Sequence, residues 1–483
     1  MAGEGDDQLK LLGLWVSPYT HRVKLALSFK GLSYEYVEED LSNKSELLLS
    51  TNPVHKKVPV LIHNGKPICE SQVIVQYLDE EFPNSGVSLL PSDSYDRAIA
   101  RFWAAYINDK LMPSWLQSSM GKTEEERAEA LKQTLEAVAN LETAFKECSK
   151  GKPFFGGDTV GYLDVSLGAM IGWMRAGEAL HGRRTFDATR SPLLNAWMER
   201  FAALDAAKAA MPDNNKLVEF VRNSLKASPK QRRMAAGGGG GDELKLLGLW
   251  ASPYVLRAKF ALSFKGLSYE NVEEDLHNKS ELLLSSNPVH KKVPVLIHNG
   301  KPICESQIIV EYVDEAFPDA GESLLPSDPY DRAVARFWAA YINDKFMPAW
   351  QKASLGLTEE EKAEAVKQML AAIENLETAF KELSKGKPFF GGDTAGYLDV
   401  TLGAVVGWAR AGEVLFGRKL FDATRSPLLA AWMERFVALD AVKAVLPDNA
   451  ELIEYGKMRM AHYAKLAAAL AAANKNRKPN LKS

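Results

Sequence analysis

The sequence predicts a small α/β domain followed by an all-helical domain, and it predicts this pair twice. The first observation is a repeat, because the segment LKLLGLWVSPY that begins at Leu9 returns as LKLLGLWASPY near Leu244, 235 residues along the chain. Solenoid units span only about 20–50 residues, so each copy is long enough to be a complete module. The second observation is that strand signals end near Asp93, and only helical periodicity follows.

The elements of the first copy follow in order along the chain. Short apolar strands are expected at 10–15, 34–38, 58–62 and 66–69, with an Asn-Gly turn joining the last two. Helices are expected at 18–30 and 71–82, the second capped by Ser71 and ending before Pro83. This order describes a mixed sheet with helices on it. Helical patterns then cover 93–120, 124–148, 162–180, 191–204 and 214–226, and the second copy repeats them all.

These patterns divide the chain into four domains and two other segments. The α/β domains are expected at 8–87 and 243–322, and the helical domains at 93–226 and 328–457. Residues 227–242, ASPKQRRMAAGGGGGD, read as a flexible linker because they carry little apolar surface. The tail, 458–483, is predicted to be an alanine-rich helix with a basic end. A dispensable extension, a cap over the neighbouring module and a surface anchor all remain open for it.

Composition excludes several classes of function. The formal net charge of −3 argues against nucleic acid as the main partner, since phosphate binding needs a basic excess. No apolar run reaches the roughly 18 residues of a membrane span, and MAGEGDDQLK is unlike a signal peptide. Three cysteines without CxxC spacing favour a reducing compartment, and we expect the cytosol. The eight histidines show no metal-ligand spacing, so no metal is expected.

Three short motifs of the α/β domain are candidates for a binding site. Ser17 precedes Pro18 at a strand-to-helix turn, where it could simply cap the helix or direct its hydroxyl at an anion. Val58-Pro59 opens a strand after a polar loop, and a cis bond there would present the Val58 backbone to an extended ligand. At Glu70-Ser71 a carboxylate and a hydroxyl could hold the two charges of an amino-acid head, although Ser71 could also be only a cap.

Two lysines complete the constellation. Lys44 and Lys57 lie on polar loops and could meet a second carboxylate of the ligand, although surface lysines are usually only solvated. The whole set recurs in the second copy, as Ser252, Lys279, Lys292, Val293-Pro294 and Glu305-Ser306. Together the motifs predict a site for an extended anionic peptide that has an amino-acid head and a carboxylate tail.

The motifs SPYTHRVKLAL, NKSELLL, NPVHKKVPVLIHNGKPICESQ and ARFWAAYINDK resemble those of a plant tau-class glutathione transferase, in tandem over about residues 9–225 and 244–455. The resemblance implies a thioredoxin-like glutathione domain followed by an all-helical domain in each module. It implies Ser17 and Ser252 as catalytic residues, and as glutathione-binding residues Lys44, Val58, Glu70, Ser71, Lys279, Val293, Glu305 and Ser306. The electrophile pockets it implies are Met112, Leu116, Ser119 and Trp173, and Met347, Gln351, Ser354 and Trp408. Because the copies differ at Leu116/Gln351, their substrates should differ.

Two positions depart from the family pattern. Tyr19 and Tyr254 stand where phenylalanine is frequent, and Gly161 and Gly396 stand where serine or threonine would open a capping box.

The function that the resemblance implies is conjugation of the glutathione thiolate to hydrophobic electrophiles in detoxification and stress response, with a peroxidase side activity. A ligandin that carries hydrophobic ligands without turnover is the alternative. A thiol-disulfide oxidoreductase is disfavoured because serine replaces the active-site cysteine. Family members generally pair as dimers, so we expect the two modules to pair within one chain, with a homodimer as the other outcome.

Overall fold

The computed structural model describes residues 8–121, 123–182, 184–224 and 241–476. The chain divides into two compact units, one made mainly of residues 1–238 and the other mainly of 239–483. Most of the predicted linker, and the end of the tail beyond Asn476, lie outside the described residues. Gly241 and Asp242, the last two residues of that predicted linker, already belong to the first strand of the second module.

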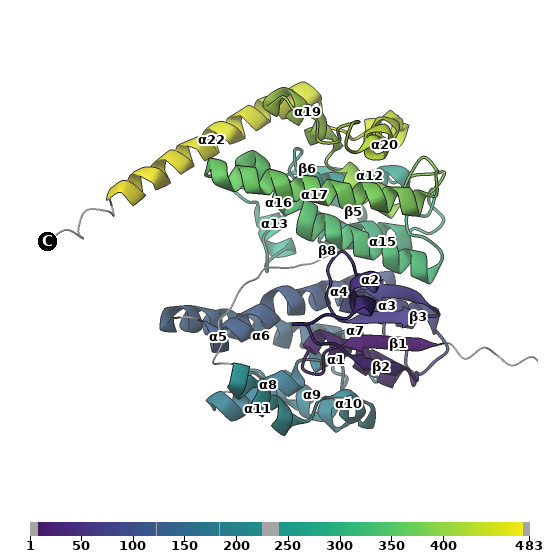
Figure 1. Ribbon diagram of the computed structural model, residues 1–483, viewed down its shortest axis with the longest axis vertical. Helices are drawn as coiled ribbons and strands as arrows, with labels where there is room; N and C mark the ends of the chain where they lie inside the picture. The colour runs from purple at the N-terminus through teal and green to yellow at the C-terminus, as the bar shows by residue number, and fades with distance from the viewer. Residues whose placement is uncertain (1–7, 122, 183, 225–240, 477–483) are drawn as a thin grey trace, which may run out of the picture. The chain divides into compact units, whose positions relative to one another are not determined.

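The α/β domain of the first module is built on a four-stranded sheet, drawn in purple in Figure 1. The strand order is β2-β1-β3-β4, in which β1 pairs parallel with β2 and antiparallel with β3. All four residues of β3 are buried, which agrees with the apolar run that predicted it. The elements of this domain are β1 (Leu9–Gly13), α1 (Pro18–Phe29), β2 (Glu35–Glu38), α2 (Glu46–Thr51), β3 (Val60–His63), β4 (Lys66–Cys69) and α3 (Ser71–Glu81).

The rest of the first module is helical, as the sequence predicts. The predicted helix at 93–120 is interrupted by a π-helical turn, and the predicted helix at 162–180 is two helices separated at residues 169–170. The elements are α4 (Ser94–Tyr106), η1 (Ile107–Leu111), α5 (Met112–Met120), α6 (Glu124–Ser149), α7 (Tyr162–Gly168), α8 (Ile171–His181), α9 (Pro192–Ala203), α10 (Asp205–Ala210) and α11 (Asn214–Ser224).

The second module repeats this fold, with the sheet order β6-β5-β7-β8. Its α/β domain comprises β5 (Gly241–Gly248), α12 (Pro253–Phe264), β6 (Glu270–Glu273), α13 (Glu281–Ser286), β7 (Val295–Asn299), β8 (Lys301–Cys304) and α14 (Ser306–Ala316). Its helical domain comprises α15 (Pro329–Tyr341), η2 (Ile342–Phe346), α16 (Met347–Leu355), α17 (Glu359–Ser384), α18 (Tyr397–Gly403), α19 (Val406–Phe416), α20 (Pro427–Ala438), α21 (Asp440–Lys443) and α22 (Asn449–Asn476).

The predicted tail helix is continuous with the helix before it. In Figure 1 this single long helix, α22, is the yellow end of the chain.

Two short helices of each module were missed from the sequence, α2 and α10 in the first and α13 and α21 in the second. The segment expected as a loop after β2 contains α2, which begins because Ser45 accepts a hydrogen bond from Leu48 N at 3.0 Å and donates to Glu39 Oε1 at 2.6 Å. The second is α10, directly after α9. Helices of one to two turns carry too few periodic positions to be distinguished from loops by pattern alone.

Candidate active site

Ser17 lies at the turn between β1 and α1, where it caps the helix. Its Oγ accepts a hydrogen bond from Thr20 N at 3.3 Å, and Pro18 occupies the first helical position. The strand and helix approach closely here, since a Cβ on Gly13 would lie 2.4 Å from Thr20 Cγ2. Ser252 repeats the arrangement, with its Oγ accepting from Val255 N at 3.4 Å. Because each Oγ is an acceptor in the cap, its own O–H remains able to donate to a ligand.

The backbone around Ser17 is held by groups from distant parts of the module. The indole Nε1 of Trp173, from α8, donates to Val16 O at 2.7 Å, and Trp15 N donates to Glu38 Oε1 at 2.9 Å. In the second module Trp408 Nε1 donates to Ala251 O, also at 2.7 Å. Trp173 and Trp408, predicted only as pocket residues, therefore also position the serine turn.

In each module a buried arginine connects the helix that follows the serine turn to the helix that begins at Ser71 or Ser306. The sequence reasoning missed this arginine. Arg22 lies on α1 and donates to Ser71 Oγ at 2.7 Å and to Asn108 Oδ1, on the π-helical turn, at 2.8 Å. Arg257 does the same with Ser306 Oγ at 3.2 Å and Asn343 Oδ1 at 2.6 Å. Burial lowers the pKa of both guanidinium groups, that of Arg257 to about 10. The signal was available, because this arginine follows the Ser-Pro-Tyr motif in both copies.

Ser71 is the first residue of α3, and Glu70, the position before it, is the helix cap. Glu70 occupies that position with φ of 70°, and Glu305 has φ of 67°, a left-handed conformation that is uncommon for a residue other than glycine. The prediction that Ser71 caps the helix is thus wrong by one residue. Since Ser71 Oγ accepts from Arg22, its O–H and the first backbone amides of α3 can donate to an anion.

The remaining predicted glutathione residues lie on the loops around the sheet. Lys44 and Lys279 are half-buried and Lys57 and Lys292 are exposed. Among residues the structure describes, the side chains of Lys44, Lys57 and Lys279 make no hydrogen bond or ion pair, so their ammonium groups can bind an anion. The bonds Val58-Pro59 and Val293-Pro294 are both cis. The Lys57 carbonyl accepts from Asn52 Nδ2 at 2.9 Å, which shapes the loop before Val58.

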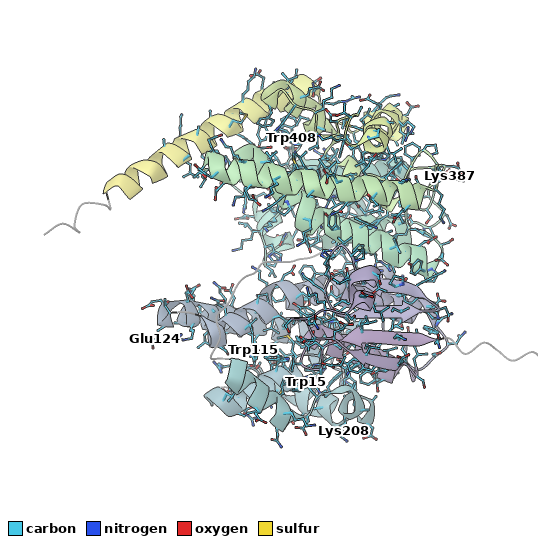
Figure 2. All side chains as sticks on the ribbon, viewed as in Figure 1. Trp15, Trp115, Glu124, Lys208, Lys387 and Trp408 are labelled. Atoms are coloured by element: carbon cyan, nitrogen blue, oxygen red, sulfur yellow. The ribbon has the colours of Figure 1, made fainter. Side chains whose placement is uncertain are left out.

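A pocket in the second module brings together three of its four predicted electrophile residues. Gln351, Ser354 and Trp408 line a cavity that is partly open to solvent, whereas Met347 is fully buried and does not line it. Figure 2 labels Trp408 in this module and Trp115 in the first. Burial raises the pKa of the nearby Tyr254, and a hydrogen bond with the Gln351 side chain opposes part of the rise.

The first-module counterparts differ in their surroundings. Met112 is buried with its sulfur 4.0 Å from Arg22 Nη2, Leu116 is exposed, and Ser119 and Trp173 are half-buried. Trp173 packs with Val16 and Ala176 in an apolar cluster beside the serine turn.

The described residues contain neither a candidate metal site nor a candidate membrane span. No described group of three or more histidine, cysteine or acidic side chains could hold a metal ion. Within the described ranges, no helix has the length and apolar character required to cross a bilayer.

Comparison with known proteins matches both modules to the same pair of domain families. The glutathione S-transferase N-terminal domain matches residues 7–80 and 242–315, and the C-terminal domain matches 124–200 and 359–435. The chain is 58% identical over 238 residues to "Probable glutathione S-transferase GSTU6" of Oryza sativa subsp. japonica, and the match covers 48% of this chain and 100% of that protein.

Two solved structures are similar to one module each. The tau-class glutathione S-transferase of mango, Mangifera indica, is 48% identical with a TM-score of 0.44, covering 45% of this chain and 99% of that one. A rice enzyme, solved in complex with glutathione, is 38% identical with a TM-score of 0.43, covering 46% and 98%. The domain matches occur twice and the rice relative spans only half of this chain, so the chain belongs to the glutathione S-transferase family as a tandem, two-module member of the tau class.

Proposed function

We propose that each module conjugates the thiolate of glutathione to hydrophobic electrophiles, with Ser17 and Ser252 as the catalytic residues. The observation that carries the proposal is the repetition of the whole arrangement. Each module has a serine at a helix amino terminus, a tryptophan holding its turn, and an arginine bound to the serine that begins α3 or α14.

Glutathione fits the donors and acceptors around this turn. The Ser71 hydroxyl and the first amides of α3 would hold the carboxylate of its amino-acid head, and Glu70 would hold the ammonium. The Val58 backbone would pair with the peptide, and Lys44 would meet the second carboxylate. In the second module the corresponding residues are Ser306, Glu305, Val293 and Lys279.

The chemistry depends on the acidity of the thiol. A free thiol has a pKa near 8.5, and lowering it by about 2 units requires roughly 2.7 kcal/mol of preferential stabilisation of the thiolate. The O–H of Ser17, donating to the sulfur at the positive end of α1, provides stabilisation of this kind. The thiol proton goes to solvent, the sulfur forms a bond to the electrophilic carbon, and the leaving group departs with its electron pair.

Protein thiols are poorly suited to replace the glutathione sulfur. Burial raises the pKa of Cys69 and of Cys148 to about 12, and it raises the pKa of Cys304 well above its ordinary value. All three thiols are therefore protonated near neutral pH, which supports a mechanism that does not use cysteine.

The same thiolate could attack a hydroperoxide, which would give the peroxidase side activity. We further propose that the protein acts in the cytosol and that its modules pair within one chain. A ligandin function would require binding of hydrophobic ligands without turnover, and the test below distinguishes it.

The test is the double variant Ser17→Ala/Ser252→Ala, assayed with glutathione and 1-chloro-2,4-dinitrobenzene. We expect kcat/KM at pH 6.5 to fall by roughly ten- to fiftyfold, because the variant loses the hydroxyl's part of the roughly 2.7 kcal/mol that favours the thiolate, and the thiol pKa returns toward 8.5. Each single variant should retain the activity of the other module. Glutathione affinity should change little, since the hydroxyl acts on the thiolate.

The matched control is Thr123→Ala, which removes the cap of α6, where Thr123 Oγ1 accepts from Glu126 N at 3.1 Å, without touching the site. Its activity should be unchanged. If the double variant keeps its rate and its pH profile, the serine assignment is wrong. If the unaltered protein binds hydrophobic ligands but turns over neither an aryl halide nor a hydroperoxide, the protein is a ligandin.

A further inference from the structure

The two modules differ in how one tryptophan of the helical domain is held. In the first module Trp115 Nε1 donates to Thr185 Oγ1 at 2.9 Å, and the ring packs edge-on against Trp173 with centroids 6.2 Å apart. A Cβ on Gly177 would lie 2.8 Å from Trp115 Cζ2, so the ring lies directly over α8 at this glycine. Trp115 therefore occupies the space between α5 and α8.

None of these contacts occurs among the residues of the second module that the structure describes. Leu420 stands where the first module has Thr185, and among the described residues the indole N–H of Trp350 has no hydrogen-bond partner. A Cβ on Gly412, the counterpart of Gly177, would meet only the Phe416 ring, at 3.6 and 3.9 Å. Trp350 and Gly412 instead both line the pocket that contains Gln351, Ser354 and Trp408. The second module thus has Leu420 in place of the Thr185 hydroxyl, and it has an open pocket. Trp350 lines this pocket, and its indole N–H has no partner among the described residues.

The same pocket is lined by cations and by no carboxylate. Arg418, Lys419 and Arg459 are the charged residues of its lining. Lys419 is paired with Glu413 at 3.5 Å, and Arg418 lies over the Phe416 ring at 5.8 Å. Arg459, on α22, is half-buried and forms no ion pair with any residue that the structure describes. At the corresponding position of the sequence the first module has the uncharged Ser224.

We propose that the second module selects hydrophobic electrophiles that carry an anionic group, a carboxylate or a sulfonate. The apolar part of the ligand lies against Trp350, Trp408 and Leu420, and its anion pairs with Arg459 and accepts from the Trp350 N–H. Turnover of such a ligand rests on the proposed transferase function, whereas its binding does not. The pocket is lined mainly by apolar side chains, as ligand pockets usually are, and the unpaired guanidinium supplies the charge complementarity.

Binding is tested on the full chain with two dyes of nearly the same shape. The anionic probe is 8-anilinonaphthalene-1-sulfonate and the neutral probe is N-phenyl-1-naphthylamine. Arg459→Ser, which installs the first-module residue, should weaken second-module binding of the anionic dye by roughly fivefold and leave the neutral dye unchanged. Arg459→Lys should restore most of the affinity. Leu420→Thr, which offers the indole a hydroxyl partner, should also weaken the anionic dye.

Lys457→Ser is the control, because Lys457 lies on the same helix but pairs with Glu454 at 2.6 Å and does not line the pocket. This variant should bind both dyes as tightly as the unaltered protein does. The proposal is overturned if Arg459→Ser weakens the binding of both dyes equally, or if it weakens the binding of neither.

Turnover is tested in the Ser17→Ala background, so that the second module supplies the signal. The substrates are 4-chloro-3,5-dinitrobenzoate and its methyl ester, which share one reacting carbon. Arg459→Ser should lower kcat/KM for the acid relative to the ester by roughly fivefold, mainly through KM. If neither substrate reacts while the dyes behave as expected, the proposed function fails and the binding inference stands. If both react and Arg459→Ser leaves their ratio unchanged, the inference fails alone.

Discussion

His21 shows how one residue can give the two modules different responses to acid. It lies on α1, is 2% exposed, and contacts Trp15 O through Nε2 at 2.6 Å, while its Nδ1 is buried without a hydrogen-bond partner among the described residues. Burial lowers its pKa to about 4. Leu256 occupies the same position in the second module, where no such titration exists.

Whether acid stabilises or destabilises the first module depends on which state, folded or unfolded, binds the His21 proton more tightly. Since the folded pKa is about 4 and the ordinary value is 6.5, the unfolded chain binds the proton more tightly. The stability of the first module is therefore complete above pH 6.5 and falls as the pH drops from 6.5 to 4. By pH 5 the loss is about 2 kcal/mol. Asp164 and Asp399 have a pKa raised by burial to about 6 in both modules, so their effects cancel between modules.

We therefore expect His21→Leu to remove this acid sensitivity from the first module. Hydrogen exchange, followed by mass spectrometry at pH 8 and pH 5, measures the opening free energy of α1 peptides separately from α12 peptides. In the unaltered protein α1 should lose about 2 kcal/mol more than α12, and in the variant the difference should vanish. Leu256→His is the reciprocal control and should transfer the sensitivity to α12. If His21→Leu changes the opening free energy of α1 by the same amount at pH 8 and at pH 5, His21 is not the source of the acid sensitivity.

At the scale of elements, the start of α7 depends on one buried carboxylate. Asp164 accepts hydrogen bonds from the backbone N–H of Phe155, Gly156 and Gly161, at 3.0, 2.9 and 2.8 Å, and from Trp197 Nε1 at 2.7 Å. Glycine is required at the cap of α7, because a Cβ on Gly161 would lie 2.8 Å from Gly156 Cα. The departure from serine or threonine at this position thus has a steric cause.

Asp164→Ala should destabilise the first module by about 3 kcal/mol or more, because four buried donors lose their acceptor together. Urea unfolding of the full chain, with exchange of peptides from α7 and α9 to assign the affected module, measures this loss. Asp205→Ala provides the comparison, since Asp205 pairs only with Lys208 at the surface and should contribute less than 1 kcal/mol. A loss no larger than that of Asp205→Ala would show that water replaces the carboxylate as acceptor.

At the scale of the whole molecule, two modules of a family that generally pairs are joined in one chain. Without Gly241 and Asp242, which belong to β5, the predicted linker has about 14 residues and would span roughly 19–22 Å on average as a flexible coil. Tethering of this kind raises the effective concentration of one module around the other to about the millimolar range. Pairing within the chain is then favoured over pairing between chains at micromolar concentration.

We therefore expect a single species near the chain mass of 53.3 kDa. Light scattering during size-exclusion chromatography at about 10 µM measures it directly. A mass near twice that value would mean that modules pair between chains. Dilution by a hundredfold serves as the control, because a species formed within the chain keeps its mass on dilution.

Local features were determined by the sequence alone. The repeat, the order of α/β and helical domains, the strands of each sheet and the Ser17 turn all follow from periodicity, capping and turn residues, which act over a few neighbouring positions. What only the tertiary structure decided joins residues far apart. Arg22 reaches Ser71 and Asn108 across 49 and 86 residues, and Trp173 reaches Val16 across 157. The open pocket depends likewise on where Trp350 lies relative to α19. No local pattern encodes such contacts, because their partners are chosen by packing of the folded chain.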